Sequence, residues 1–432
     1  MTKQKISRRK FIRVGSVIGG AAFLQACGLS PTETATYPLS TSLPTEAAWK
    51  TPSATAAIAQ AAATPTPTGT ATASPSATAS PAPADTATAT APPTTQAEPL
   101  ATAGETSPVE PTPTPSPTPY PPGPPSKLGL FITRNDSQAL EVIKVGKPPL
   151  IKTLELDPNF AKGIKTLAPQ SILVGRIALD QMNLDAEPLA LARQFVDTLL
   201  PVAGDAGRMP YFDAWEAYNE PVADTPDKVK RLADFEAERT RLLAPYGLKS
   251  VVGNFATGHP PLELWPQFDA ALASIREFGG YLGLHEYSAP IMQYGSGALQ
   301  QNNGSDQGDE GWLTLRYRKA YRNYLTPMGY GDIPLLITEC GVDGLVGGRP
   351  GPPKARGWKD FIDTWLASGL RNDPPGVYMD QLIWYDKELR KDSYVKGAAI
   401  FVAGASPGWE SYDILGRPAE LLQQYLEVHP QY

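Results

Sequence analysis

The chain has 432 residues, with 38 basic and 44 acidic side chains that give a formal net charge of −6. Its two cysteines, Cys27 and Cys340, exclude a disulfide-rich scaffold, and its three histidines lack the spacing of a structural zinc site. An acidic chain without a basic stripe argues against nucleic acid as a partner. We therefore expect no bound metal, no cofactor and no nucleic acid.

The first 26 residues have the order of an export signal. Arg8 and Arg9 precede an uncharged run, Val14 to Leu24, whose 11 residues are too few to cross a bilayer, since a spanning helix takes about 20 residues. This order resembles a bacterial twin-arginine signal peptide. Residues 24–27, Leu-Gln-Ala-Cys, resemble a lipobox, which implies lipidation of Cys27 at the mature N-terminus. The alternative is an ordinary cleaved signal in which Cys27 is incidental.

The composition then predicts a disordered tether. Residues 31–126 contain 22 of the 46 prolines, no phenylalanine, and otherwise mostly Thr, Ala and Ser. Such a segment buries too little apolar surface to offset the entropy of ordering it, and its Pro-Thr repeats favour extended polyproline II. With Cys27 lipidated, the domain that follows is held at the extracellular face of a bacterial cytoplasmic membrane, with release from that membrane left open. We expect a monomer.

Eight short apolar runs of strand length occur in residues 127–432. They lie at 128–132, 149–154, 172–177, 212–218, 250–253, 281–284, 335–338 and 395–401. Between them, apolar residues recur with helical spacing in four series: Leu189 to Leu199, Trp265 to Phe278, Leu313 to Tyr324 and Tyr378 to Leu389. Two short helices are predicted at 137–145 and 159–166, and Gly247 marks a further helix end.

Strands alternating with helices over about 300 residues favour a (β/α)8 TIM barrel, which has that size. The alternative is a doubly wound open sheet. It is disfavoured because residues 133–136, directly after the first strand, lack a glycine-rich phosphate-binding turn. The predicted organisation is a signal peptide (1–26), a disordered tether rich in Pro, Thr and Ala (27–126) and one barrel domain (127–432).

Two of the predicted strands end in a glutamate. The fourth leads into residues 215–221, Trp-Glu-Ala-Tyr-Asn-Glu-Pro, and the seventh into residues 337–341, Ile-Thr-Glu-Cys-Gly. Because the active site of a TIM barrel lies at the carboxyl ends of its strands, Glu220 and Glu339 are expected to face each other. Cleavage of a glycosidic bond requires such a pair, one carboxyl group to protonate the leaving oxygen and one to attack the anomeric carbon.

These motifs resemble those of clan A, the large clan of retaining (β/α)8 glycoside hydrolases that includes cellulases, xylanases, β-xylosidases and β-1,3-glucanases. The resemblance implies that Glu220 is the acid/base and Glu339 the nucleophile, acting on β-linked sugars by double displacement with carboxyl groups about 5–5.5 Å apart. Many members carry an arginine near the end of the second strand, where residues 154–157 offer none. Lys152 or Arg176 are candidates to replace it.

The same resemblance implies further contacts. Asn219 corresponds to an asparagine that binds the sugar 2-hydroxyl. Residues 285–287, His-Glu-Tyr, resemble the clan's His-x-Tyr motif, so Tyr287 is expected to hydrogen-bond the nucleophile and His285 to contact substrate. Tyr287 has the alternative of being an ordinary barrel tyrosine. Trp409, after the eighth strand, is interpreted as a platform for a sugar face or, equally, as a packing residue at the barrel end.

Other residues near the motifs have plainer interpretations. Glu216 and Glu286 are interpreted as structural residues or substrate contacts. Lys152 and Arg176 lie on predicted strands, where a charge inside a barrel needs a partner. Cys340 is interpreted as a buried small residue, because no histidine stands beside it in sequence to activate a thiol.

Long loops at 288–310 and 341–357 are expected to border the mouth and set substrate choice. The predicted function is a lipid-anchored retaining glycoside hydrolase that cleaves β-linked poly- or oligosaccharide outside the cell, with carbohydrate and membrane as partners. Two alternatives are a non-catalytic glycan-binding lipoprotein on a barrel scaffold and a cell-wall adhesin. The presence of both glutamates favours the enzyme, because a binding protein has no need of a second carboxylate at this place.

Overall fold

The computed structural model describes residues 120–296 and 309–431. Eight parallel strands form one closed barrel, in which each strand pairs with the next along the chain and the last pairs with the first. The strands are β1 (Leu128–Ile132), β2 (Leu150–Thr153), β3 (Ile172–Gly175), β4 (Ala214–Glu216), β5 (Ser250–Phe255), β6 (Gly280–Ser288), β7 (Leu335–Val342) and β8 (Val395–Ala403). The predicted (β/α)8 TIM barrel is confirmed.

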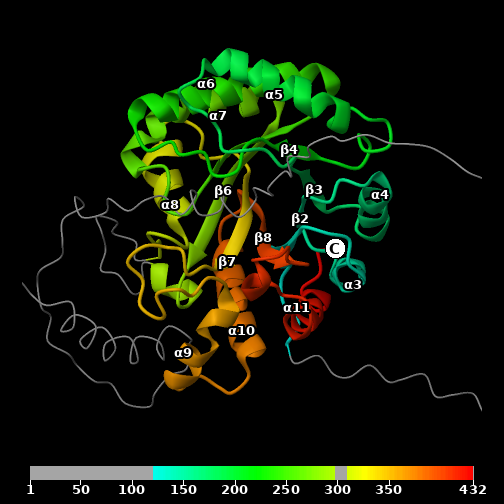
Figure 1. Cartoon of the computed structure of the whole chain (residues 1–432), viewed down its shortest axis with the longest axis vertical. Helices are drawn as coiled ribbons and strands as arrows, with labels where there is room; N and C mark the ends of the chain where they lie inside the picture. The colour runs from blue at the N-terminus through cyan, green and yellow to red at the C-terminus, as the bar shows by residue number, and fades with distance from the viewer. Residues whose placement is uncertain (1–119, 297–308, 432) are drawn as a thin grey trace, which may run out of the picture. The chain divides into compact units, whose positions relative to one another are not determined.

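Helices between the strands cover the outside of the barrel, with α5, α6 and α7 packed side by side (Figure 1). The helices are α3 (Ser137–Gly146), α4 (Pro158–Leu167), α5 (Pro188–Ala203), α6 (Pro226–Leu243), α7 (Asp269–Phe278), α8 (Arg316–Ala320), α9 (Ile362–Ala367), α10 (Pro374–Leu389) and α11 (Arg417–Glu427). Short 3-10 segments are η2 (Ala244–Tyr246), η3 (Leu262–Phe268), η4 (Met292–Gly295), η6 (Trp358–Phe361) and η7 (Glu410–Tyr412). A π-helical turn, η5 (Tyr321–Leu325), follows α8.

Side chains at the strand–helix turns fix where helices begin. Asp157 accepts hydrogen bonds from the N–H groups of Asn159 and Phe160, and Pro158 occupies the first position of α4. Thr225 caps α6 in the same way, again before a proline. Caps satisfy N–H groups that have no partner inside the helix, and proline lacks the N–H that would be unpaired there. The loops at the carboxyl ends of the strands therefore have fixed lengths.

The barrel has an inner and an outer apolar layer. The inner layer is filled by one set of strand residues, among them Phe131, Val174, Val251 and Leu336. The outer layer lies between sheet and helices and is larger. Lys152, paired in register with Phe131 and Val174, therefore belongs to the inner face, where it is fully buried.

The helix predicted over Leu313–Tyr324 differs from the structure. Helix α8 begins only at Arg316, after Leu315 adopts a left-handed backbone with φ of 62°. The carboxylate of Glu286 accepts the N–H groups of Leu315 and Tyr317. A buried acceptor from a distant strand thus determines where α8 begins, and periodicity alone gives no sign of it.

The described chain starts with a segment packed on the barrel. The rings of Tyr120 and Tyr425 meet edge-on at 5.5 Å, and buried Ser126 donates its N–H to the carbonyl of His429. Tyr120 and Ser126 come before residue 127, so the part of the chain that packs on the barrel begins earlier than the predicted start of the domain. The predicted signal peptide, Cys27 and the tether up to residue 119 lie outside the described residues. Within residues 120–296 and 309–431, no helix is long and apolar enough to cross a membrane.

Candidate active site

Two buried glutamates lie at the carboxyl ends of β4 and β7. Glu339 belongs to β7, Glu220 follows the end of β4, and they are 6% and 7% exposed. A carboxylate oxygen of Glu220 lies within 4.8 Å of one of Glu339. The carboxyl groups of retaining glycosidases are about 5–5.5 Å apart and those of inverting ones about 6.5–9.5 Å apart, so two glutamates this close fit the retaining arrangement better. Glu220 has a φ of 43°, a left-handed conformation uncommon for residues other than glycine.

Glu339 is held by groups from three strands. Lys152 of β2 places Nζ 2.9 Å from Glu339 Oε1, and Tyr287 of β6 donates its hydroxyl to Oε2 at 2.8 Å. The guanidinium of Arg176, directly after β3, lies 3.5 Å from Oε1. Both basic residues that the sequence offered in place of the missing arginine thus contact the glutamate at the end of β7.

These partners decide the ionisation of Glu339. Burial by itself raises the pKa of this carboxyl group, but the charges of His285, Lys152 and Arg176, in that order, outweigh burial and lower the pKa below its ordinary value. Burial, followed by the charge of Glu339, raises the pKa of Tyr287 well above its ordinary value, so the phenol keeps the proton that it donates. Glu339 is therefore ionised at neutral pH, as a nucleophile must be.

His285 lies between the two glutamates. Its Nδ1 is 2.8 Å from Glu220 Oε1 and 3.5 Å from Glu339 Oε2. The side chain is fully buried, and its Nε2 has no hydrogen-bond partner within residues 120–296 and 309–431. The sequence predicted a contact between His285 and substrate; in the structure the ring lies against both carboxyl groups.

Asn219 is tied to the same cluster. Its Oδ1 accepts a hydrogen bond from the Arg176 guanidinium, which also lies beside Glu339. The backbone carbonyl of Glu220 accepts a hydrogen bond of 3.2 Å from Gln181, in the loop after β3. The Asn-Glu pair is thereby fixed to the β3 side of the mouth.

Trp409 belongs to an aromatic cluster on the β8 side. Its ring centre is 5.3 Å from those of Phe401 and Tyr412, and the Arg356 guanidinium lies 4.6 Å from it. Phe401 meets the ring of Tyr287 edge-on at 6.2 Å, which joins this cluster to the glutamates. Trp409 is half-buried, so it packs in this wall and keeps part of its ring exposed.

Asp343, the first residue after β7, was not predicted from the sequence as a site residue. Its Oδ1 accepts hydrogen bonds from the Tyr412 hydroxyl at 2.7 Å and from the Leu345 N–H at 2.8 Å. Burial raises the pKa of Asp343 to about 6, and the charge of Glu220 contributes to the rise. The charge of Glu220 thus acts on Asp343, the first residue after the strand that carries Glu339. The signal for it was an acid four residues after Glu339 in the sequence.

Glu286 and Cys340 point to the outer side of the barrel wall. Glu286 accepts the Tyr385 hydroxyl at 2.7 Å as well as two backbone N–H groups at the start of α8. Burial raises the pKa of Glu286 to about 7 despite these donors. Burial also raises the pKa of Cys340 well above its ordinary value, which keeps the thiol neutral. Both residues serve the packing between strands and helices.

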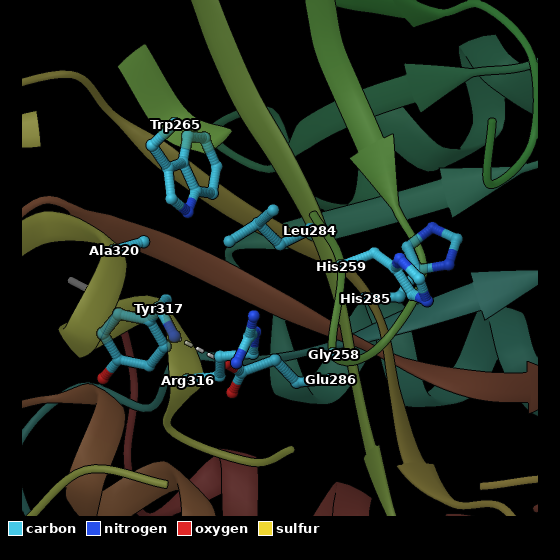
Figure 2. A pocket seen from close by; sticks show the side chains of 9 residues that line it. All are labelled: Gly258, His259, Trp265, Leu284, His285, Glu286, Arg316, Tyr317 and Ala320. Carbon is cyan, nitrogen blue, oxygen red and sulfur yellow. Dashed lines mark hydrogen bonds between the residues drawn. The ribbon is translucent and has the colours of Figure 1, made fainter. Parts of the chain in front are cut away.

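A small cavity lies beside the site, bounded by β6, the loop after β5 and the start of α8 (Figure 2). His259, Trp265 and Arg316 are among its lining residues. Burial, followed by the charge of Arg316, lowers the pKa of His259, and the charge of Glu220 acts in the opposite direction. Neither Glu220 nor Glu339 lines this cavity, so it adjoins the pair of carboxyl groups without containing it.

Three of these residues have the side-chain types that bind metal ions. Glu220, His285 and Glu339 each offer one ligand atom, all within 4.8 Å of one another. Two cations compete for that place, since Lys152 Nζ and the Arg176 guanidinium lie 2.9 Å and 3.5 Å from a Glu339 oxygen. Their charges oppose a metal ion and favour an anionic carboxylate that reacts directly.

Comparisons with known proteins concern the fold. No protein-family model and no curated protein matches the chain. A solved β-glucuronidase from Ruminococcus gnavus matches with a TM-score of 0.42 and 13% identity, over 70% of this chain and 50% of its own, so the chain spans about half of that protein. A GH128 subgroup II endo-β-1,3-glucanase from Pseudomonas viridiflava matches with a TM-score of 0.37 and 15% identity, over 71% of this chain and 98% of its own. At these identities the similarity extends to the fold alone.

Proposed function

We propose that the chain is a retaining glycoside hydrolase that cleaves β-linked oligo- or polysaccharide by double displacement. One observation carries the proposal: two buried carboxyl groups with oxygens within 4.8 Å have different partners. Glu339 is held by two cations and a phenol and has the Nδ1 of His285 at 3.5 Å, whereas Glu220 has that Nδ1 at 2.8 Å and neither cation. These surroundings suit an ionised nucleophile beside an acid that exchanges a proton.

In the first step a Glu339 oxygen attacks the anomeric carbon and forms an ester. The bond from that carbon to the leaving oxygen breaks, its electron pair goes to the leaving oxygen, and Glu220 supplies the proton. Lys152 and Tyr287 hold the attacking carboxylate in place. Asn219 is assigned to the sugar 2-hydroxyl and Trp409 to a sugar face.

In the second step Glu220 acts as a base. Its carboxylate takes a proton from water, whose oxygen attacks the anomeric carbon and displaces Glu339. The sugar leaves with the anomeric configuration of the substrate, because the carbon has been inverted twice. His285 lies 2.8 Å from Glu220 Oε1, so its imidazole can keep a hydrogen bond to this carboxyl group in both steps.

The proposal includes the site of action. Cys27 carries lipid, and the Pro-, Thr- and Ala-rich segment after it lets the barrel act at the extracellular face of the cytoplasmic membrane. Labelled fatty acid should be incorporated into the full chain and not into Cys27→Ser. Equal labelling of both would contradict the anchor and leave the barrel chemistry untouched.

The test of the activity is hydrolysis by the full chain of a panel of aryl β-glycosides with β-glucan, xylan and mannan. Proton NMR should show the β-anomer of the product first, with the α-anomer appearing later by mutarotation. Glu339→Gln and Glu220→Gln are the matched controls, since both keep the size of the side chain and replace its ionisable carboxyl group with a neutral amide.

Two outcomes contradict the proposal in different ways. If the α-anomer forms first, the reaction inverts and Glu339 is a base. If no member of the panel is hydrolysed while one polymer is bound, and neither substitution alters binding, the protein is a glycan-binding lipoprotein on an inactive barrel.

A further inference from the structure

A third buried glutamate lies beneath the nucleophile. Glu216, the last residue of β4, is fully buried, and its Oε2 is 2.8 Å from Lys152 Nζ and 3.9 Å from the Arg176 guanidinium. Lys152 is fully buried as well and lies 2.9 Å from Glu339 Oε1. One ammonium group thus stands between two carboxylates in the barrel interior.

Glu216 differs from other buried glutamates of the described chain. Glu286 accepts backbone N–H groups at the start of α8, and Glu236 accepts the N–H of Gly253 while pairing with Arg239 at 2.6 Å. Neither oxygen of Glu216, by contrast, has a hydrogen-bond partner within residues 120–296 and 309–431, and Oε2 is compensated only by its ion pairs with Lys152 and Arg176. A glutamate that anchors the fold binds the backbone; Glu216 is compensated by the cations of the nucleophile.

The charges in this cluster change during the proposed reaction. At rest, two cations, Lys152 and Arg176, face two carboxylates. When a Glu339 oxygen forms the ester with the anomeric carbon, the electron pair of the breaking bond leaves with the aglycone and takes the proton of Glu220. Glu339 is then neutral, and Lys152 loses one of its two partners. A buried ammonium group without a counterion is strongly unfavourable.

We infer that Glu216 is the counterion that holds Lys152 while Glu339 is esterified, and that it thereby stabilises the covalent intermediate. The inference rests on the proposed function. Glu216 is a positioning residue, since it touches neither sugar nor reacting atoms. In the free enzyme it also shares the ammonium group, which leaves the Glu339 carboxylate less tightly bound and more nucleophilic.

The substitution Glu216→Gln separates this role from a structural one. In the variant Lys152 binds Glu339 alone before the reaction and has no counterion after it, so ester formation slows. Ester hydrolysis becomes faster, because it returns to Lys152 the carboxylate that it lacks. The effects on the two steps are opposite in sign, whereas a general loss of packing slows both.

The measurement uses the 2,4-dinitrophenyl β-glycoside of the sugar that the wild-type chain hydrolyses. With this leaving group, kcat follows ester hydrolysis and kcat/KM follows ester formation. Glu216→Gln should lower kcat/KM about 10- to 100-fold, keep or raise kcat, and abolish the pre-steady-state burst of dinitrophenol. A fall of kcat and kcat/KM by the same factor, with the burst kept, would overturn the inference.

Two further variants guard against a folding defect. Glu236→Gln removes a buried carboxylate of α6 that is ion-paired with Arg239 and contacts neither Lys152 nor Glu339, and it should lower the melting temperature while changing kcat and kcat/KM by the same factor. In a Lys152→Met background, Glu216→Gln should change the ratio of kcat to kcat/KM far less than in the wild type, because the ammonium group is gone. If Glu216→Gln changed the ratio of kcat to kcat/KM as much in that background as in the wild type, the role of Lys152 would be contradicted.

The failure of this inference is distinguishable from failure of the proposed function. Absence of turnover by the wild-type chain on any aryl glycoside contradicts the glycosidase itself. Turnover with a burst in the wild type, joined to a proportional loss in Glu216→Gln, contradicts only the counterion role of Glu216.

Discussion

Two buried glutamates on neighbouring strands have opposite protonation behaviour. Glu286 of β6 and Glu339 of β7 are 2% and 6% exposed, and both strands contribute to the same wall. Burial raises the pKa of Glu286 to about 7, whereas cations hold the pKa of Glu339 below its ordinary value. The outer side of the wall offers Glu286 hydrogen-bond donors that are neutral, whereas the inner side offers Glu339 the charges of His285, Lys152 and Arg176. The two side chains are similarly buried, so their different pKa shifts arise from the side of the barrel wall to which each points.

The largest effect is expected when Glu339, the glutamate on the inner side of the wall, is made neutral. Glu339→Gln removes the proposed nucleophile and should reduce kcat/KM for an aryl β-glycoside by about 10⁴-fold or more. Melting temperature, measured beside the wild type, shows whether the fold is kept. Residual activity within about tenfold of the wild type would mean that another group attacks the sugar.

Glu220→Gln is expected to have a smaller effect that depends on the leaving group. Loss of the acid should reduce kcat/KM about 10²- to 10⁴-fold for substrates with a poor leaving group, and much less for a dinitrophenyl glycoside, which needs no protonation. A Brønsted plot of rate against leaving-group pKa measures this dependence. An equal loss for all leaving groups would contradict the role of Glu220 as acid.

Lys152→Met removes a cation beside Glu339 and so makes the surroundings of Glu339 more like those of Glu286. Because Glu339 must be ionised to react, loss of the cation 2.9 Å from it should raise its pKa. The acidic limb of the pH profile of kcat/KM should then move upward by about 1–3 pH units. The double variant Lys152→Met, Glu216→Gln should show the same shift without leaving Glu216 unpaired. An unmoved limb would assign the ionisation to another cation.

Glu286→Gln is expected to alter stability and leave the chemistry unchanged. The pKa of Glu286 is raised to about 7 in the folded state, and a free glutamate titrates near 4.3. Its contribution to stability is therefore complete below about pH 4 and is lost as pH rises through about 7. Relative to the wild type, the variant should lose less of its melting temperature between pH 5 and pH 8, with kcat/KM little changed. Parallel melting curves against pH would contradict this assignment.

The sequence predicted the barrel because its strands and helices have clear periodicities. The predicted ends of β4 and β7 were accurate enough to predict that Glu220 and Glu339 lie close together. The start of α8 was missed, since it depends on Glu286, a partner far away in the chain. For Lys152 and Arg176, the sequence indicated only that a charge inside the barrel needs an oppositely charged partner. It did not identify the cluster that they form with Glu216. Which carboxylate each cation contacts depends on the register and closure of the barrel.

The most direct test of the central claim is rescue by azide. In Glu339→Ala, azide is expected to restore cleavage of an aryl β-glycoside and to yield the α-glycosyl azide, because it attacks from the face that Glu339 occupied. In Glu220→Ala it should yield the β-glycosyl azide, because it attacks the ester in place of water. If the two variants gave the opposite anomers, or if neither was rescued while both remained folded, the assignment of nucleophile and acid/base would be wrong.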